Sequence, residues 1–345
     1  MGQFGGKITS LEINSYSQSI YWDGKKFNNL EETTMDFPLN KMPKLLFDQF
    51  FGKKKNIPKN TLSVVPFDKE AFLEPSDKMK FIWYGHSAIL MRINNKTIFI
   101  DPMLGKDAAP IAPFSVKRFN SVSVDSIIEI PEIDLLVISH DHYDHLDFKS
   151  IQALQPKVNQ YFVALGVARH LVSWGVDASL ITEFDWWQMK EFQDIQITFT
   201  PTRHFSGRGL RDRFKGLWGG WAFKTSTENI LFSGDGGYGE HFKEIGQKLG
   251  PFDFSFTECG QYNELWRQIH LFPDESVKAG LETRSKVIMP VHWGTFNLSN
   301  HHWTEPADHF VENCLNNDIP YLIPKIGELV TPSSSYVNSA WWKSL

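Results

Sequence analysis

Residues 135–145 read LLVISHDHYDH, an apolar run followed directly by three histidines and two aspartates. The run 135–138 is short and partly β-branched, which predicts a buried strand. The polar cluster then falls on the loop after that strand's carboxyl end, a common place for a functional site. Imidazole and carboxylate groups bind zinc and similar divalent ions, whereas so many polar groups near a core would be poorly solvated without a cation. This density favours a site for two adjacent metal ions over a polar loop that only caps a strand.

Further candidate ligands follow the ends of three later predicted strands, namely His204, Asp235 and His292. A lone histidine at a strand end is usually structural, but three such junctions after the first cluster reverse that expectation. Two ions about 3.5–4 Å apart need about three protein ligands each and a shared carboxylate. The predicted ligands are His140, His142 and His204 for one ion, Asp144, His145 and His292 for the other, and Asp235 as the bridge. A hydroxide between the two ions would be the nucleophile. The ligands favour zinc, and manganese and iron also fit.

This pattern resembles the metallo-β-lactamase superfamily of dinuclear hydrolases, whose whole ligand set is similar in type and order. The likeness covers about residues 79–330. It implies an α/β fold, an αβ/βα sandwich of two mixed β-sheets flanked by helices, with the metals at one edge. Within the superfamily, the chain is most similar to N-acyl-phosphatidylethanolamine-hydrolysing phospholipase D and its bacterial relatives. The segments that carry this likeness are 83–87, 99–102, 204–208, 217–221 and 289–296.

The resemblance implies a metal-dependent phosphodiesterase that acts on N-acyl-phosphatidylethanolamine-like phospholipids. Asp144 and Asp235 would be catalytic through the metals. His270 matches a further active-site histidine of that family and could donate to a phosphate oxygen or to the leaving group. Phe205 departs from the family, which often has tryptophan there. Two alternatives stay open: a lactonase or other ester or amide hydrolase of the ascorbate-6-phosphate lactonase type, and a non-catalytic metal- or lipid-binding protein.

Three further residues are candidates for supporting or substrate-binding roles. Asp101 could orient a metal-bound histidine, and His86 could hydrogen-bond at the metal edge. Arg208 could bind phosphate or form a surface ion pair. Asp147 is equally well explained as the N-cap of a following helix.

The composition of the chain argues against one class of binding partner. The net charge of −5 and the absence of a basic stripe argue against nucleic acid. We expect a small-molecule or phospholipid substrate, with peripheral membrane association as an option, and the oligomeric state is not predicted.

No run reaches the ~18 apolar residues of a membrane span and no signal peptide is evident. The localisation is not predicted: we expect a protein that is soluble as given, and cytoplasmic, or membrane-associated or periplasmic if an N-terminal segment was removed. The two cysteines, Cys259 and Cys314, form no predicted zinc pair or disulfide.

The chain divides into a predicted arm, residues 1–78, which is irregular and packs on a hydrolase domain, residues 79–345. Within the domain, hairpins are predicted at 88–100 and 221–232, and further strands at 80–84, 161–165 and 253–257. Predicted helices cover 148–154, 167–174, 274–283 and 305–315, the third with Asp274 as its N-cap.

Overall fold

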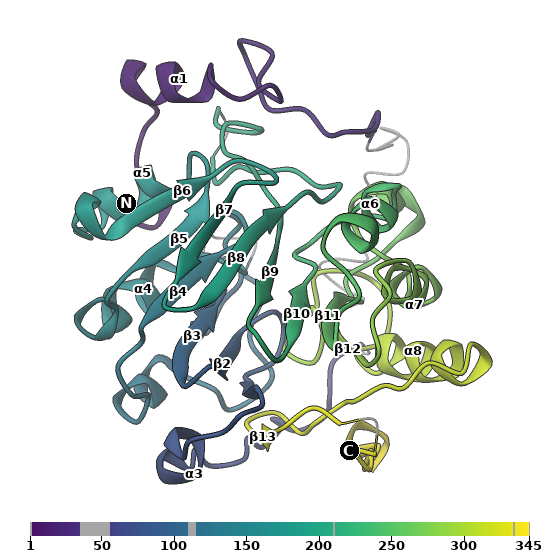
Figure 1. Ribbon diagram of the computed structural model, residues 1–345. Coiled ribbons are helices and arrows are strands. Elements are labelled where there is room, and N and C mark those ends of the chain that lie inside the picture. The colour runs from purple at the N-terminus through teal and green to yellow at the C-terminus, as the bar shows by residue number, and fades with distance from the viewer. Residues whose placement is uncertain (1, 35–55, 110–114, 210, 334, 345) are drawn as a thin grey trace.

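The computed structural model describes residues 2–34, 56–109, 115–209, 211–333 and 335–344. Two mixed β-sheets form the centre, and helices cover their outer faces (Figure 1). This arrangement confirms the predicted αβ/βα sandwich.

The first sheet has seven strands in the order β13-β1-β2-β3-β4-β5-β6. Its strands are β1 (Lys80–Trp83), β2 (Ile89–Ile93), β3 (Lys96–Ile100), β4 (Leu135–Ile138), β5 (Tyr161–Ala164), β6 (Ile181–Phe184) and β13 (Leu329–Val330). Strands β3 to β6 run parallel, whereas β13, β1, β2 and β3 pair antiparallel. The predicted strand 135–138 is therefore an interior strand of this sheet, which explains its continuous apolar sequence.

The second sheet has six strands in the order β12-β11-β10-β9-β8-β7. Its strands are β7 (Met189–Phe192), β8 (Ile195–Thr200), β9 (Gly220–Lys224), β10 (Asn229–Phe232), β11 (Phe254–Glu258) and β12 (Ile288–Val291). The last three run parallel, and the others pair antiparallel. Parallel neighbours such as β10, β11 and β12 bring their carboxyl ends to one edge of the sheet.

Aromatic side chains join the two sheets. The ring of Phe81 in the first sheet lies 5.6 Å from that of Phe254 and 4.9 Å from that of Phe256 in the second. Phe184 and Trp221 make a similar contact at 5.2 Å. All five side chains are buried, so much of the abundant aromatic content forms the core between the sheets.

The helices lie outside the sheets or in the connections between strands (Figure 1). They are α1 (Ser10–Tyr16), α3 (Lys69–Leu73), α4 (Phe148–Leu154), α5 (Ala168–Ser173), α6 (His241–Lys248), α7 (Pro273–Glu282) and α8 (Glu305–Asn316). Helices α4 and α5 accompany the first sheet, whereas α6, α7 and α8 accompany the second (Figure 1). None of the helices in the described ranges is long and apolar enough to cross a membrane.

The predicted hairpins 88–100 and 221–232 are confirmed as β2–β3 and β9–β10. The turn of the first hairpin contains Asn94 and Asn95 at φ of 48° and 59°, a conformation that asparagine tolerates. The predicted N-cap at Asp274 is wrong, because α7 starts at Pro273 and the N-cap position belongs to Phe272. Asp274 instead lies in the first turn, where its charge still complements the helix dipole.

The sequence also missed several elements. Strand β7 exposes its first three residues and β6 leaves its first three half-buried, so both carry weak apolar patterns. Helix α6 was not recognised either. The segment 1–78 is less irregular than expected, since it forms α1 and α3 within its described residues. The division into an arm and a domain stays a prediction. Cys259 and Cys314 are both free and buried.

Candidate metal centre

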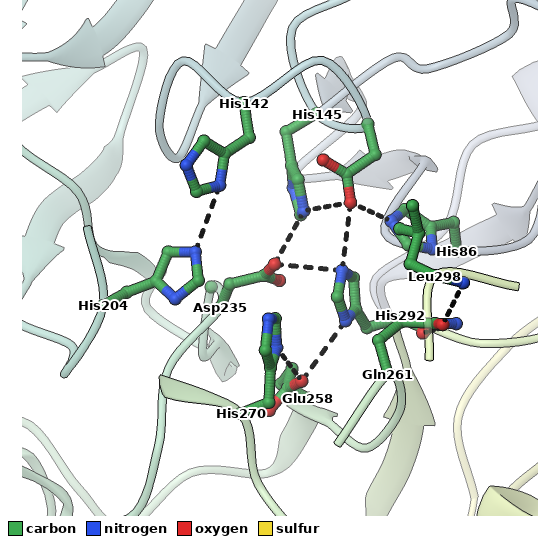
Figure 2. A network of polar contacts seen from close by, with 12 residues as sticks. His86, His142, His145, His204, Asp235, Glu258, Gln261, His270, His292 and Leu298 are labelled. Carbon is green, nitrogen blue, oxygen red and sulfur yellow. Dashed lines mark hydrogen bonds and ion pairs between the residues drawn. The ribbon is translucent and has the colours of Figure 1, made fainter. Parts of the chain in front are cut away.

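The predicted ligands gather at the edge where the strands of both sheets end. The cluster 140–145 follows β4, and His204, Asp235 and His292 follow β8, β10 and β12. The apolar strands are buried against each other, and their first polar residues therefore emerge together at the edge of the sandwich. Figure 2 shows how the side chains of five of them converge, namely His142, His145, His204, Asp235 and His292.

His140, His142 and His204 form one group of potential ligands. The Nε2 atom of His140 lies 2.9 Å from Nδ1 of His142, and Nε2 of His204 lies 3.2 Å from the same atom. The ligand atoms of all three lie within 4.8 Å of one another, a spacing that could hold a metal ion.

Asp144, His145 and His292 form a second group. Asp144 Oδ2 lies 3.7 Å from His145 Nε2 and 3.3 Å from His292 Nε2. His86 joins this group, because its Nε2 lies 2.9 Å from the same oxygen. The ligand atoms of these four residues also lie within 4.8 Å of one another.

Asp235 lies between the two groups (Figure 2). Its Oδ2 is 2.9 Å from His145 Nε2 and 2.9 Å from His292 Nε2. Its Oδ1 is buried without a hydrogen-bond partner among the described residues. The ligand atoms of Asp235, His140 and His145 lie within 4.8 Å of one another, as do those of Asp235, His204 and His270. This position suits a carboxylate shared by two ions.

The protonation of these residues also fits divalent cations. Burial holds the pKa values of His140, His142 and His204 below the usual range, which keeps their imidazoles neutral and able to donate a lone pair. Burial alone would lower the pKa of His145 as well, but the Asp235 and Asp144 carboxylates raise it to about 10. The electrostatic potential around the second group is therefore strongly negative. A divalent cation would offset the negative charge of its carboxylates. The donor set as a whole fits two such ions.

Hydrogen bonds from the opposite ring nitrogens fix the orientation of most of the imidazoles. Asp101 Oδ2 lies 2.8 Å from His145 Nδ1 and also accepts from the Ser139 hydroxyl. His204 Nδ1–H donates to the Ile269 carbonyl at 2.9 Å, which leaves Nε2 for a metal. Carboxylate and carbonyl partners of this kind usually tune metal-bound histidines. Asp101 thus contacts the ring nitrogen of His145 that faces away from Asp235, and its role in orienting a metal-bound histidine stays a prediction.

Glu258 is the main residue of the site that the sequence reasoning missed. Its side chain is fully buried at the end of β11, where Oε1 lies 3.2 Å from His292 Nδ1 and 2.9 Å from His270 Nδ1. Its other oxygen accepts from the Leu271 backbone N–H at 2.6 Å. The available signal was its place at a strand end, since the predicted strand 253–257 stops directly before it.

A cavity of about 400 Å³ opens beside the ligands. Its lining includes His142, Asp144, Asp235 and His292. His270 also lines it, with its ligand atom within 4.8 Å of those of His204 and Asp235. A substrate in this cavity would therefore contact the ligand groups and His270 together.

Arg208 differs from both roles considered for it. Its side chain is only 3% exposed, so it forms no surface ion pair. The guanidinium donates to the backbone carbonyls of Gln3, Asp141 and Leu146. It also lies over the Tyr143 ring at 4.1 Å. These contacts place Arg208 behind the cluster loop, where it holds the loop's backbone rather than facing the cavity.

Asp141, between the first two histidines of the cluster, is not one of the predicted ligands and contacts other residues. Its carboxylate accepts from Arg169 Nη2 at 3.1 Å and from the Gly207 backbone N–H at 2.7 Å, and lies 3.2 Å from His170 Nε2. Burial alone would raise the pKa of Asp141, but His170 and Arg169 hold it well below the usual range. This buried ion pair anchors the cluster loop from behind.

Asp147 is the N-cap of α4, as considered, and accepts from the Ser150 backbone N–H.

Comparison with known proteins agrees with this geometry. Residues 96–293 match the family model described as a β-lactamase superfamily domain. An uncharacterized protein of Mycobacterium tuberculosis is 32% identical over 343 residues, covering 98% of this chain and 91% of the relative. N-acyl-phosphatidylethanolamine-hydrolyzing phospholipase D 1 of Caenorhabditis elegans is 33% identical over 244 residues, covering 67% of this chain and 68% of the relative.

Among solved structures, the metallo hydrolase Igni18 of the archaeon Ignicoccus hospitalis has the same fold. It aligns with a TM-score of 0.58 at 18% identity, covering 74% of this chain and 99% of that one. The family model, the relatives and the fold agree with the ligand groups at the sheet edge, and we conclude that the chain belongs to the metallo-β-lactamase superfamily of metal-dependent hydrolases.

Proposed function

We propose that this hydrolase uses two metal ions and cleaves phosphodiesters, with N-acyl-phosphatidylethanolamine-like phospholipids as substrates in the manner of a phospholipase D. One observation carries the proposal of two ions: Asp235 lies between two separate groups of converging ligand atoms. The phosphodiester substrate is supported by the identity to the nematode phospholipase D, which spans two thirds of both chains.

In this proposal, His140, His142 and His204 hold one ion, Asp144, His145 and His292 hold the other, and Asp235 bridges them. Bound divalent ions would supply a nucleophile at neutral pH, by acidifying water, and would stabilise charge on the attacked phosphoryl group. We infer zinc as the metal because histidine dominates both groups, although manganese and iron suit mixed ligands too. Asp144 and Asp235 act in catalysis by fixing the ions beside the cavity.

His270 is the candidate general acid. Its Nδ1 lies 2.9 Å from the Glu258 carboxylate, so Nδ1–H donates there and Nε2 remains for the substrate. A proton held at Nε2 could pass to the leaving alcohol oxygen, which would otherwise depart as an unstable alkoxide. The place of His270 on the cavity wall supports this role.

A phospholipid substrate would require contact with a bilayer, and the N-terminal segment offers apolar side chains for it. Leu11 and Ile20 are 78% and 87% exposed, and Ile13 is 45% exposed. The same segment reaches the metal edge, since the Asn29 side chain donates to the His204 carbonyl at 2.8 Å. We propose peripheral membrane association through these residues. Flotation with phosphatidylethanolamine vesicles tests it, and unchanged flotation of a Leu11→Ser, Ile20→Ser variant would refute it.

The activity is tested by turnover of the zinc-loaded protein on bis(p-nitrophenyl) phosphate, on an N-acyl-phosphatidylethanolamine and on a panel of lactones. We expect turnover of both phosphodiesters that is lost in an Asp235→Asn variant. Hydrolysis of lactones alone would refute the phosphodiesterase and favour the alternative of a lactonase on the same metals. Full phosphodiesterase activity after metal removal would refute the metal mechanism.

A further inference from the structure

One ligand of the first group is held separately from the other two. His140 and His142 share the cluster loop, whereas His204 reaches them from the segment after β8. Figure 2 shows His204 facing His142, and the distance from His204 Nε2 to His142 Nδ1 is 3.2 Å. The Ile269 carbonyl fixes the far side of the His204 ring. The position of His204 Nε2 therefore depends also on how the backbone of His204 is held.

The side chain of Asn29 pairs with that backbone. Asn29 Nδ2 donates to the His204 carbonyl at 2.8 Å, and Asn29 Oδ1 accepts from the His204 N–H at 3.1 Å. His204 is only 1% exposed, so its backbone groups need partners within the protein. Trp218, which is fully buried, donates its indole N–H to the same Asn29 oxygen at 3.1 Å and fixes the amide in turn.

The residues before Asn29 are anchored in the core. The Asp23 carboxylate accepts from two backbone N–H groups of its own turn, each at 2.8 Å. Phe27 follows this turn and is fully buried, with its ring centre 5.4 Å from that of Tyr16 and 4.9 Å from that of Trp22. Asn29 therefore starts from a fixed point and is not the tip of a loose loop.

The residues after Asn29 contact the two segments that flank His204. Arg203 directly precedes His204, and its Nε donates to the Thr33 hydroxyl at 3.1 Å. Gln268 directly precedes Ile269, and its side-chain oxygen accepts from the Thr34 N–H at 2.8 Å. The N-terminal segment thus holds His204 from both of its supports.

We propose that Asn29 is a positioning residue of the metal centre, which sets the backbone of His204 and thereby the affinity for the ion of the first group. The proposal rests on the proposed two-ion function and adds the N-terminal segment to the metal site. Without the Asn29 amide, two buried backbone groups lose their partner, and a shift of His204 relieves this cost. Metal–ligand distances vary by only about 0.2 Å, so a small shift weakens binding.

Asn29→Ala is the primary test, measured by competition with a fluorescent zinc chelator. We expect the affinity for one of the two ions to fall about 10–100-fold, as for other partners that orient metal ligands. The visible absorption of the Co²⁺-loaded variant should change as well, because it reports the coordination geometry. Wild-type affinity for both ions would overturn the proposal.

A double-mutant cycle separates positioning from a general loss of stability. If Asn29 acts through the His204 imidazole, Asn29→Ala should weaken zinc binding no further in a His204→Ala background. Losses that add in the double variant would overturn the proposal. Urea unfolding of the metal-free proteins shows whether each variant is folded.

Asn28→Ala is the matched control. The Asn28 side chain donates to the Lys26 carbonyl at 3.4 Å, within its own segment. We expect wild-type zinc affinities in this variant. An equal loss in Asn28→Ala and Asn29→Ala would assign the effect to folding of the N-terminal segment and would overturn the proposal.

Asn29→Asp decides the question if Asn29→Ala does not fold. It keeps the shape and the acceptor oxygen of Asn29, but replaces the donor with an oxygen that faces the His204 carbonyl. The added negative charge alone would tighten the binding of cations, whereas displacement of His204 weakens it. Weaker binding of one ion supports the proposal, and unchanged or tighter binding of both ions overturns it.

These measurements do not depend on turnover, so they separate the proposal from the proposed function. Selective weakening in Asn29→Ala, in a protein that cleaves none of the phosphodiesters, would refute the phosphodiesterase and leave the positioning role standing. A wild-type protein that binds a single ion would refute the two-ion function. The role of Asn29 then stands if Asn29→Ala weakens that ion and is overturned if it does not.

Discussion

Glu258 Oε1 lies 2.9 Å from His270 Nδ1 and 3.2 Å from His292 Nδ1, so one buried carboxylate orients a candidate metal ligand and the candidate general acid together. Figure 2 shows the carboxylate beneath both imidazoles. A residue in this position links the metal groups to the wall of the cavity.

Glu258→Gln should therefore affect metal binding and turnover together. The amide can replace only part of the two interactions, and loss of such a partner typically lowers metal affinity or activity about 10–100-fold. Competition with a fluorescent zinc chelator, together with kcat on bis(p-nitrophenyl) phosphate, measures both. Glu264→Gln is the control, because that carboxylate is 74% exposed and pairs with Arg267 at the surface. Wild-type zinc affinity in Glu258→Gln would contradict the orienting role.

Asp235→Asn should remove the bridge between the two ligand groups. The neutral amide weakens binding of both ions, and we expect metal content to fall to about one ion or fewer and kcat to fall on the order of 10³-fold. Elemental analysis after dialysis gives the metal content. Two tightly bound ions in this variant would show that Asp235 is not shared.

His86→Asn should selectively weaken the group formed by Asp144, His145 and His292. His86 adopts a left-handed φ of 53°, which asparagine tolerates, so backbone strain is not the main effect. The hydrogen bond to Asp144 is lost, and affinity for one of the two ions should fall about 10–100-fold. A two-site metal titration measures this effect, with exposed His309→Asn as the control. Equal weakening of both ions would contradict a role limited to the second group.

Arg169→Met should destabilise the fold strongly. It leaves the Asp141 carboxylate buried with one partner fewer, and breaking a buried ion pair typically costs about 3–5 kcal/mol of unfolding free energy. Urea denaturation of the metal-free protein measures the change. Arg267→Met is the control, since its surface pairs should contribute about 1 kcal/mol or less. A loss below about 1 kcal/mol in Arg169→Met would contradict the anchoring role.

Stability should fall in acid partly because of His241, which lies away from the metal groups. Burial, assisted by the Arg203 cation, lowers the pKa of His241 from 6.5 to about 3. Below about pH 6.5 His241 therefore binds a proton in the unfolded chain but not in the folded chain. The free energy of unfolding declines from there toward pH 3. His241→Leu should flatten this decline, by up to about 1.4 kcal/mol per pH unit. Metal-free samples are compared, and parallel pH profiles of the two proteins would contradict the prediction.

The sequence by itself predicted the features that depend on local pattern. Continuous apolar runs identified the interior strands, and the polar residues directly after them identified the candidate ligands, because residues at strand ends leave the core together. The order of His140, Asp235 and His292 along the chain then indicated the family before any contact was known.

The tertiary structure alone decided what surrounds those residues. Glu258 has no distinctive local pattern, and its role follows from β11 lying beside β12, which brings it next to His292. Arg208 is in a motif that suggests phosphate binding, yet folding turns it behind the cluster loop, while Arg213 lines the cavity. The spacing of residues in the sequence indicates which of them follow the end of a strand. The direction in which each side chain points depends on packing between segments far apart in the chain, and local periodicity does not encode it.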